Sequence, residues 1–154
     1  MKDRGQSGMT LIELLVVIAI IGILMGLFGW NLVRSIRAAE LREAATQVAV
    51  DLRQARSQAQ RGSRDIVVVL PGSTGGTTYR FDTDVKTIPN NVQLICKSNC
   101  GTGTTTNITY QAPYGELGAI GSIYTVRSPM NGIGDYEIRI VGVTGKVILA
   151  KAGS

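Results

Sequence analysis

The sequence predicts an α+β protein in which one long N-terminal helix packs on an antiparallel β head. Three observations support this prediction: an uncharged apolar stretch near the N-terminus, an amphipathic stretch directly after it, and short alternating runs beyond residue 62. The chain has 154 residues, a length that suits one domain with a modest core. Hydrophobic residues make up 44% and charged residues 18%, so the composition excludes a disordered protein.

The apolar stretch covers residues 14–33, because Glu13 and Arg34 are the nearest charges on either side. Its 20 residues would measure about 30 Å as a helix, which matches the hydrocarbon core of a bilayer. Lys2 and Arg4 precede the stretch and favour a cytoplasmic location for that end. A cleaved secretory signal is an alternative, but the run is long and residues 26–30 do not form a small-residue cleavage site.

The next stretch, residues 34–61, has neither Pro nor Gly and is rich in good helix formers. Apolar side chains recur at spacings of three and four residues, which is the period of a helix with one buried face. These positions are Leu41, Ala45, Val48, Leu52, Ala55 and Ala59. Gly62 is a natural helix stop. We therefore predict one continuous helix over residues 9–61.

Beyond Gly62 the sequence predicts seven short strands separated by turns of Gly, Pro, Asn or Thr. The runs cover residues 65–70, 77–81, 92–96, 107–110, 122–126, 135–143 and 146–150. The turn Thr144-Gly145 joins the last two runs into a hairpin. Strands of this kind beside an amphipathic helix are expected to form antiparallel sheets packed on it.

The composition argues against most enzyme chemistry and against metal binding. The chain has no His, the commonest general base, and its two Cys cannot alone form a tetrahedral thiolate zinc site. Glycine-rich pieces at residues 72–77, 132–134 and 145–146 lack the other residues of phosphate and dinucleotide loops. We therefore expect no catalytic residue, no cofactor and no metal.

Glu13 requires an explanation, because a carboxylate in an apolar segment is costly unless something neutralises it. Residues 8–24, GMTLIELLVVIAIIGIL, resemble the class III signal of type IV pilins and type II secretion pseudopilins. The shared pattern is a short basic leader ending in Gly, a Met or apolar first mature residue, and Glu at the fifth mature position. The resemblance implies cleavage after Gly8 by prepilin peptidase, N-methylation of Met9, and pairing of Glu13 with the Met9 amine of a neighbouring subunit. An unpaired Glu13 that reaches interfacial water is the alternative.

The same resemblance implies a domain organisation and a location. Residues 1–8 would be the cleaved leader, 9–33 the transmembrane or filament-core helix, 34–61 its amphipathic continuation, and 62–154 the head. The chain would cross the inner membrane once, contact membrane lipid, and join other subunits through an inner-membrane assembly platform, with its head outside the cytoplasm. The resemblance favours a minor pilin of a type IV pilus, with a role in DNA uptake as one option, and a minor pseudopilin of a type II secretion system is the alternative. Residues 55–68 are similar to the GspH/FimT-like minor subgroup.

Cys96 and Cys100 enclose three residues. Because disulfides persist outside the cytoplasm, we expect a bridge that closes a tight loop. A redox-active pair and two free thiols are the alternatives.

Residues 34–64 hold seven arginines against three acidic residues. Arg42, Arg53 and Arg56 fall on one flank of the apolar stripe, and arginine-rich faces can hold phosphates. Some FimT-like minor pilins bind DNA through a Gly-Arg-x-Arg motif, whose nearest match here, at Lys146, lacks the second basic residue. DNA binding through these four side chains is thus one expectation, and contacts with lipid headgroups or neighbouring subunits are the other.

Overall fold

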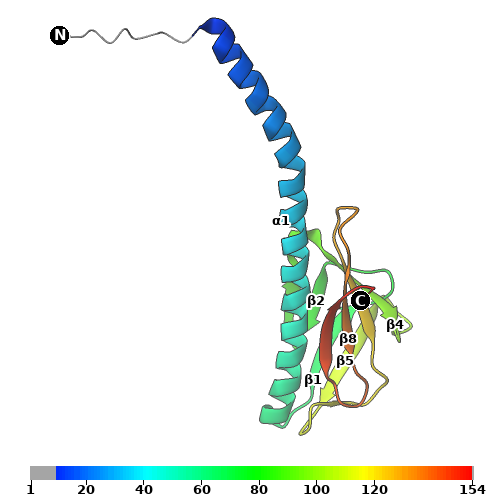
Figure 1. Ribbon diagram of the computed structural model, residues 1–154. Coiled ribbons are helices and arrows are strands. Elements are labelled where there is room, and N and C mark those ends of the chain that lie inside the picture. The colour runs from blue at the N-terminus through cyan, green and yellow to red at the C-terminus, as the bar shows by residue number, and fades with distance from the viewer. Residues whose placement is uncertain (1–9, 154) are drawn as a thin grey trace, which may run out of the picture. The chain divides into compact units, whose positions relative to one another are not determined.

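The computed structural model describes residues 10–153 and confirms the predicted fold class (Figure 1). Helix α1 spans Leu11–Gly62, and antiparallel strands follow it. Gly62 is the last helical residue, and Ser63, at φ 49°, has the left-handed conformation that ends the helix. The helix therefore ends one residue later than predicted, because the left-handed residue is Ser63 and not Gly62.

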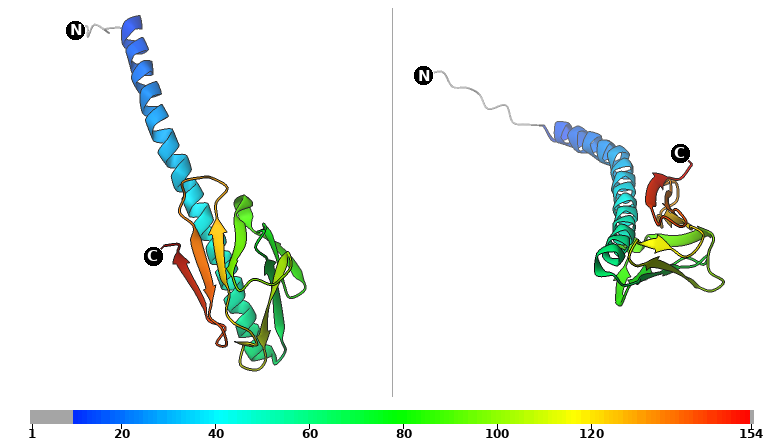
Figure 2. Two further views of the ribbon diagram at one scale, coloured as in Figure 1. Left: turned by 90° about the vertical axis from the view of Figure 1, so that its right-hand side faces the viewer. Right: turned by 90° about the horizontal axis from the view of Figure 1, so that it is seen from below.

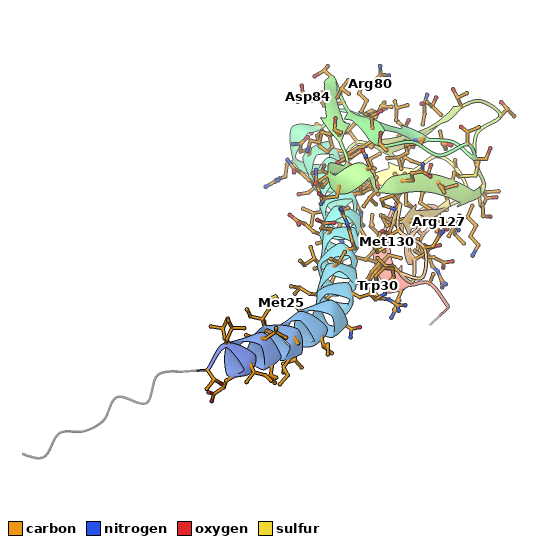
Figure 3. All side chains as sticks on the ribbon, turned by 90° about the horizontal axis from the view of Figure 1, so that it is seen from above. Met25, Trp30, Arg80, Asp84, Arg127 and Met130 are labelled. Atoms are coloured by element: carbon orange, nitrogen blue, oxygen red, sulfur yellow. A yellow bond between two sulfur atoms is a disulfide. The ribbon has the colours of Figure 1, made fainter. Side chains whose placement is uncertain are left out.

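The chain divides into two compact units, with the boundary between Ile36 and Arg37. In the first unit the described large apolar side chains of α1 are exposed, from Leu11 at 82% to Val17 at 41%. Figure 3 shows Met25 and Trp30 projecting from this part of the helix. A helix that is apolar all round requires apolar surroundings, such as lipid or other helices.

The second unit is the head, and it contains two antiparallel sheets (Figure 2). The larger sheet has the strand order β3-β2-β1-β5-β6. Its strands are β1 Ile66–Pro71, β2 Thr78–Phe81, β3 Asp84–Thr87, β5 Thr105–Gln111 and β6 Glu116–Leu117. The smaller sheet has the order β4-β7-β8-β9, with β4 Gln93–Ser98, β7 Ile123–Arg127, β8 Tyr136–Ile140 and β9 Val147–Lys151. A 3-10 turn at Pro89–Asn91 connects β3 to β4.

One core joins the head part of α1 to the inner faces of both sheets. All six predicted positions of the helix stripe are at most 1% exposed, and Ala44 and Ala49 widen the stripe. The strands alternate as a half-buried sheet requires; Ile66, Val68 and Leu70 of β1, for example, are buried while Val67 and Val69 are only partly so. The head therefore depends on the second half of α1 for its core.

The seven predicted strands are present, with three differences. The structure adds β3 and β6 to the larger sheet, where β3 pairs with β2 and β6 pairs with β5. The run predicted over residues 135–143 ends as strand β8 at Ile140. Val143 has φ 59°, a left-handed conformation outside the β region, so the chain turns earlier than the run of apolar residues indicated.

Candidate functional site

Glu13 lies in the first turn of α1, and its side chain is exposed. The helix begins directly after Thr10, whose hydroxyl accepts a bond from the Glu13 N–H at 3.4 Å. The Thr10 carbonyl accepts from the same N–H at 3.1 Å. Thr10 and Glu13 have the spacing of a capping box, in which a threonine and a glutamate three residues later satisfy the first free N–H groups of a helix. This capping box was not predicted from the sequence, although the spacing of Thr10 and Glu13 indicates it.

The other two predicted processing residues, Gly8 and Met9, lie outside the described residues. Cleavage after Gly8 and methylation of Met9 thus remain predictions. The distance between the Met9 amine and the Glu13 carboxylate is likewise not described.

Helix α1 is long and apolar enough to cross a membrane, judged by length and composition. Its most apolar window has no buried residues, so this part does not form the core of the head. A Cβ atom placed on Gly22, Gly26 or Gly29 would meet nothing within 4 Å. The three glycines therefore form open places on the helix surface, and glycines of this kind let a second helix approach closely in lipid.

Cys96 and Cys100 form a disulfide with a Cα–Cα distance of 5.7 Å. The bridge closes the loop after β4 and confirms the sequence prediction. The loop is also tied to the segment before β7, because the Asn99 amide donates to the Gly121 carbonyl at 2.6 Å and the Ser122 hydroxyl donates to the Asn99 carbonyl at 3.1 Å. The bridge therefore holds a connection between strands of the two sheets.

Two of the four predicted basic contact residues, Arg53 and Arg56, lie near the turn between β8 and β9, which carries a third, Lys146. Arg53 donates from Nη2 to the Val147 carbonyl at 3.3 Å, directly beside Lys146. Arg56 lies against the neighbouring loop, since a Cβ on Gly115 would come within 2.9 Å of its Cγ. Arg42 is eleven residues earlier on α1, about 16 Å along the helix axis from Arg53. Arg53 and Arg56 therefore lie near the turn that carries Lys146, whereas Arg42 lies farther along the helix.

The Arg56 guanidinium and the Tyr110 hydroxyl both contain buried polar atoms. Arg56 Nε and Tyr110 Oη have no hydrogen-bond partner within the described residues. Burial raises the pKa of the Tyr110 hydroxyl, and the Arg56 charge opposes this shift. The Arg56 guanidinium is therefore partly buried in the head, and it is less accessible to an external anion than Lys146 or Arg53.

Two clusters of charged side chains were not identified from the sequence. In the first, Asp51 on α1 accepts hydrogen bonds from the Tyr79 hydroxyl and from Lys86 Nζ, the latter at 2.9 Å. Asp51 is 6% exposed, and burial followed by the bond to Asp51 raises the pKa of the Tyr79 hydroxyl. Lys86 also lies 4.9 Å from the centroid of the Phe81 ring. This cluster attaches β2 and β3 to the helix.

The second cluster lies on the smaller sheet. Glu137 of β8 accepts from Lys97 at 2.7 Å and from Arg139 Nη2 at 2.8 Å. The bond to Lys97, and then the bond to Arg139, lowers the pKa of the Glu137 carboxyl below its ordinary value. Nearby, Arg127 and Asp135 form an ion pair at 3.1 Å.

Comparisons with known proteins found one matching family model and similar crystal structures. The model of the prokaryotic N-terminal methylation motif matches residues 3–29. A crystal structure of the type IV minor pilin FimU of Pseudomonas aeruginosa (strain PAO1) is similar, with a TM-score of 0.60 and 16% identity over 75% of this chain and 95% of that chain. A second FimU crystal form has a TM-score of 0.56 and 16% identity, covering 73% of this chain and 98% of that chain. No curated protein matched the chain.

Residues 3–29 of the chain are similar to the prokaryotic N-terminal methylation motif, and the fold of the chain is similar to that of the type IV minor pilin FimU.

Proposed function

We propose that the chain is a minor subunit of a type IV pilus, with a structural and not a catalytic role. One observation carries the proposal: the same helix, α1, joins a methylation motif and an exposed apolar stretch to a head with the minor-pilin fold. Prepilin peptidase would cleave after Gly8, and Met9 would be methylated. The apolar part of α1 would hold the subunit in the inner membrane until the assembly platform transfers it to the filament.

In this proposal Glu13 guides the transfer. Cleavage creates an ammonium group at Met9, near the start of α1. A carboxylate in apolar surroundings is favourable only when it is paired and hydrogen-bonded, so the Glu13 of an incoming subunit would pair with the Met9 amine of its neighbour. The exposed glycines of α1 would let the two helices pack closely.

The processing step is tested by the mass of the membrane-bound protein. Gly8→Ala should leave the leader attached and prevent assembly, because the peptidase would no longer meet the glycine at its cleavage site. Gly5→Ala, a matched change in the same leader, should be processed normally. A wild-type N-terminus at any residue other than Met9 would refute the proposed cleavage.

The role of Glu13 is tested by Glu13→Gln, which removes the charge and keeps the size. Glutamine also serves in a capping box, so this variant separates the charge from the helix cap. Membrane insertion and cleavage should continue, while the variant should be depleted from sheared filaments. Thr10→Val, which removes the capping hydroxyl and keeps the carboxylate, is the matched control and should still assemble. Quantitative mass spectrometry against wild type decides the outcome, and an undiminished amount of Glu13→Gln in filaments would show that the charge is not needed.

A minor pseudopilin of a type II secretion system is the second candidate, because the methylation motif and the apolar helix suit both kinds of filament. Deletion of the gene separates the two. Loss of surface pili with normal protein secretion supports the pilus, and the reverse result supports the pseudopilus.

DNA binding stays a prediction, and the placement of Arg53 beside Lys146 is the observation that favours testing it. A protein that binds DNA through phosphates should lose affinity steeply as salt rises, by about one power of salt concentration for each phosphate neutralised. Lys146→Gln should then weaken retention on DNA and reduce the salt slope, whereas Lys151→Gln, at the other end of β9, should have a smaller effect. Retention that is absent at low salt would remove this role.

A further inference from the structure

Strand β9 forms one edge of the smaller sheet. The backbone N–H and C=O groups of its central residue, Leu149, point away from β8. Among the residues that the structure describes, β9 pairs with β8 alone and is the last strand in the order of the smaller sheet (Figure 2, red). The Val141 N–H donates to the Lys146 carbonyl at 2.8 Å, and the Ala152 N–H donates to the Asp135 carbonyl at 2.9 Å. Hydrogen-bonded pairs alternate along an antiparallel ladder, so Ile148 and Ala150 face β8, while Val147 and Leu149 present their N–H and C=O groups on the other side.

Arg53 confirms this alternation, because its guanidinium donates to the Val147 carbonyl from the side away from β8. The four residues Val147 to Ala150 carry no charge and include no proline. Proteins usually protect such an edge with inward charges, prolines or bulges, since an exposed apolar edge strand pairs readily with another chain. Here the cations lie only at the two ends of the strand, at Lys146 and Lys151.

Exposed apolar side chains gather around this edge. Within the described part of the head, the exposed large apolar residues are Val50, Val85, Tyr114, Ile120, Val141, Val143 and Ile148. Three of these seven belong to β9 or to the turn that leads into it, and Val50 lies on α1 one turn before Arg53. Val141 and Ile148 share the outer face of the sheet, because Ile148 pairs with Arg139 and Val141 follows two residues later on that face. The edge and the apolar patch are therefore continuous.

Val143 is held in a conformation that valine rarely adopts. Its φ is 59°, and its side chain is 63% exposed. The left-handed region is costly for a β-branched residue, and glycine or asparagine would fill the position more easily. The fold supports the conformation through the Val143 carbonyl, which accepts a bond from the Leu117 N–H at 2.9 Å. Strained residues of this kind are concentrated at binding sites, where the displayed side chain is used.

We propose that the β9 edge, with the apolar side chains of Val141, Val143 and Ile148, is a docking site for an extended segment of a different filament subunit. The segment adds a strand beside β9 and carries a carboxylate at the end that meets Arg53 and Lys146. Backbone bonds to Leu149 supply affinity, and the apolar patch and the two cations select the sequence. That the segment comes from another filament subunit rests on the proposed function. The binding properties of the β9 edge do not depend on it.

A second copy of β9 fits this edge poorly. Antiparallel self-pairing centred on Leu149 would place Lys151 of the other copy opposite Val147, against the Arg53 guanidinium. Such an interface is also a two-fold one, which closes on itself as a dimer, whereas a filament requires contacts that repeat from head to tail. The charges and the symmetry both favour a different, acidic segment.

The backbone contact is tested by a pair of variants in the full chain. Leu149→Pro removes the outward N–H and leaves the bonds to β8 intact, because proline is tolerated at an edge position whose N–H faces outward. Leu149→Ala removes the same side chain and keeps the N–H, so it is the matched control. Cross-linking from position 148 to another subunit should fall about tenfold in the proline variant relative to the alanine variant, the effect of one lost hydrogen bond. Equal yields in the two variants would overturn the added strand.

The location is tested with a photo-cross-linking amino acid introduced singly at Val143 and Ile148 in cells that assemble the filament. Val85 is the control position, since it is apolar and more exposed, at 72%. Adducts from positions 143 and 148 should map to an extended, acid-ended segment of another subunit, and the control should give few. Adducts with a second copy, an equal yield at the control, or no adduct would each overturn the proposal. The amount of wild-type protein in filaments is measured in parallel, so a failure of the filament role is distinguished from a failure of this site.

Discussion

The buried carboxylate of Asp51 should make one of the largest single contributions of a polar side chain to the stability of the head. It lies on α1 and accepts bonds from the Tyr79 hydroxyl and Lys86, so its loss removes the polar attachment of β2 and β3 to the helix. Asp51→Ala leaves the Tyr79 hydroxyl buried, with that residue only 3% exposed. The chain then retains a buried donor whose acceptor has been removed, which is the costly way to break a hydrogen bond.

The expected loss in the free energy of unfolding follows from the two hydrogen bonds that Asp51 accepts, from Tyr79 and from Lys86. A hydrogen bond to a charged group is worth about 1.5–3 kcal/mol. The ion pair with Lys86 adds about 0.5 kcal/mol, because the lysine side chain is one-third exposed and partly screened. Asp51→Ala should therefore lower the free energy of unfolding by about 2–3.5 kcal/mol. Asp51→Asn keeps an acceptor for Tyr79 and should cost less, about 1–2 kcal/mol.

The assay is urea unfolding of the purified chain in detergent, followed by circular dichroism and by tyrosine fluorescence. A double-mutant cycle of Asp51→Asn and Tyr79→Phe isolates the coupling between these two side chains, which should be about 1 kcal/mol or more for a contacting pair. Asp84→Asn, an exposed change on β3, is the matched control and should stay within about 0.5 kcal/mol of wild type. If Asp51→Ala were as stable as this control, the Asp51 cluster would not attach β2 and β3 to the helix.

Four further predictions concern titration, the disulfide and the strained turn. The pKa values of Tyr79, Tyr110 and Tyr124 are raised, in each case chiefly by burial. The folded state thus keeps the tyrosine hydroxyls protonated to higher pH than the unfolded chain does. The free energy of unfolding should therefore fall as pH rises above about 10, by about 1.4 kcal/mol per pH unit for each tyrosine. In unfolding curves measured over a series of pH values, Tyr110→Phe should make this dependence on pH shallower. The pKa of Glu137 is lowered by Lys97 and Arg139, so its contribution should be present above the unfolded pKa of about 4.3 and lost as pH falls below it; Glu137→Gln should remove this part of the acid dependence. Replacing both Cys96 and Cys100 with Ala should cost about 2 kcal/mol by the loop-entropy estimate, and an unchanged urea midpoint would contradict this value. Val143→Asn should raise the free energy of unfolding by about 1 kcal/mol, since asparagine tolerates the left-handed conformation, while cross-linking from position 148 should decline.

The spacing of apolar side chains determined the helix and most of the strands without any tertiary information. The six stripe residues from Leu41 to Ala59 are buried because a helical period places them on one side, and any sheet packed on that side covers them. The methylation motif is equally local, since Gly8, Met9 and Glu13 are read within six consecutive residues. The disulfide could also be predicted from the local sequence, because its two cysteines are only four positions apart.

Other features depended on segments that are distant in the sequence. Strand β3 contains a single apolar residue, Val85, and forms because β2 provides a partner for backbone hydrogen bonds and because Asp51, 35 positions away, binds Lys86. The proximity of Arg53 to Lys146 depends on how β9 lies beside α1, and the left-handed Val143 on a bond to Leu117. The spacing of apolar residues indicates which face of a helix or strand is buried, but it does not identify the segment that packs against that face. The pairing of strands, the ion clusters and the open edge at β9 were therefore decided only when the two sheets packed on the helix.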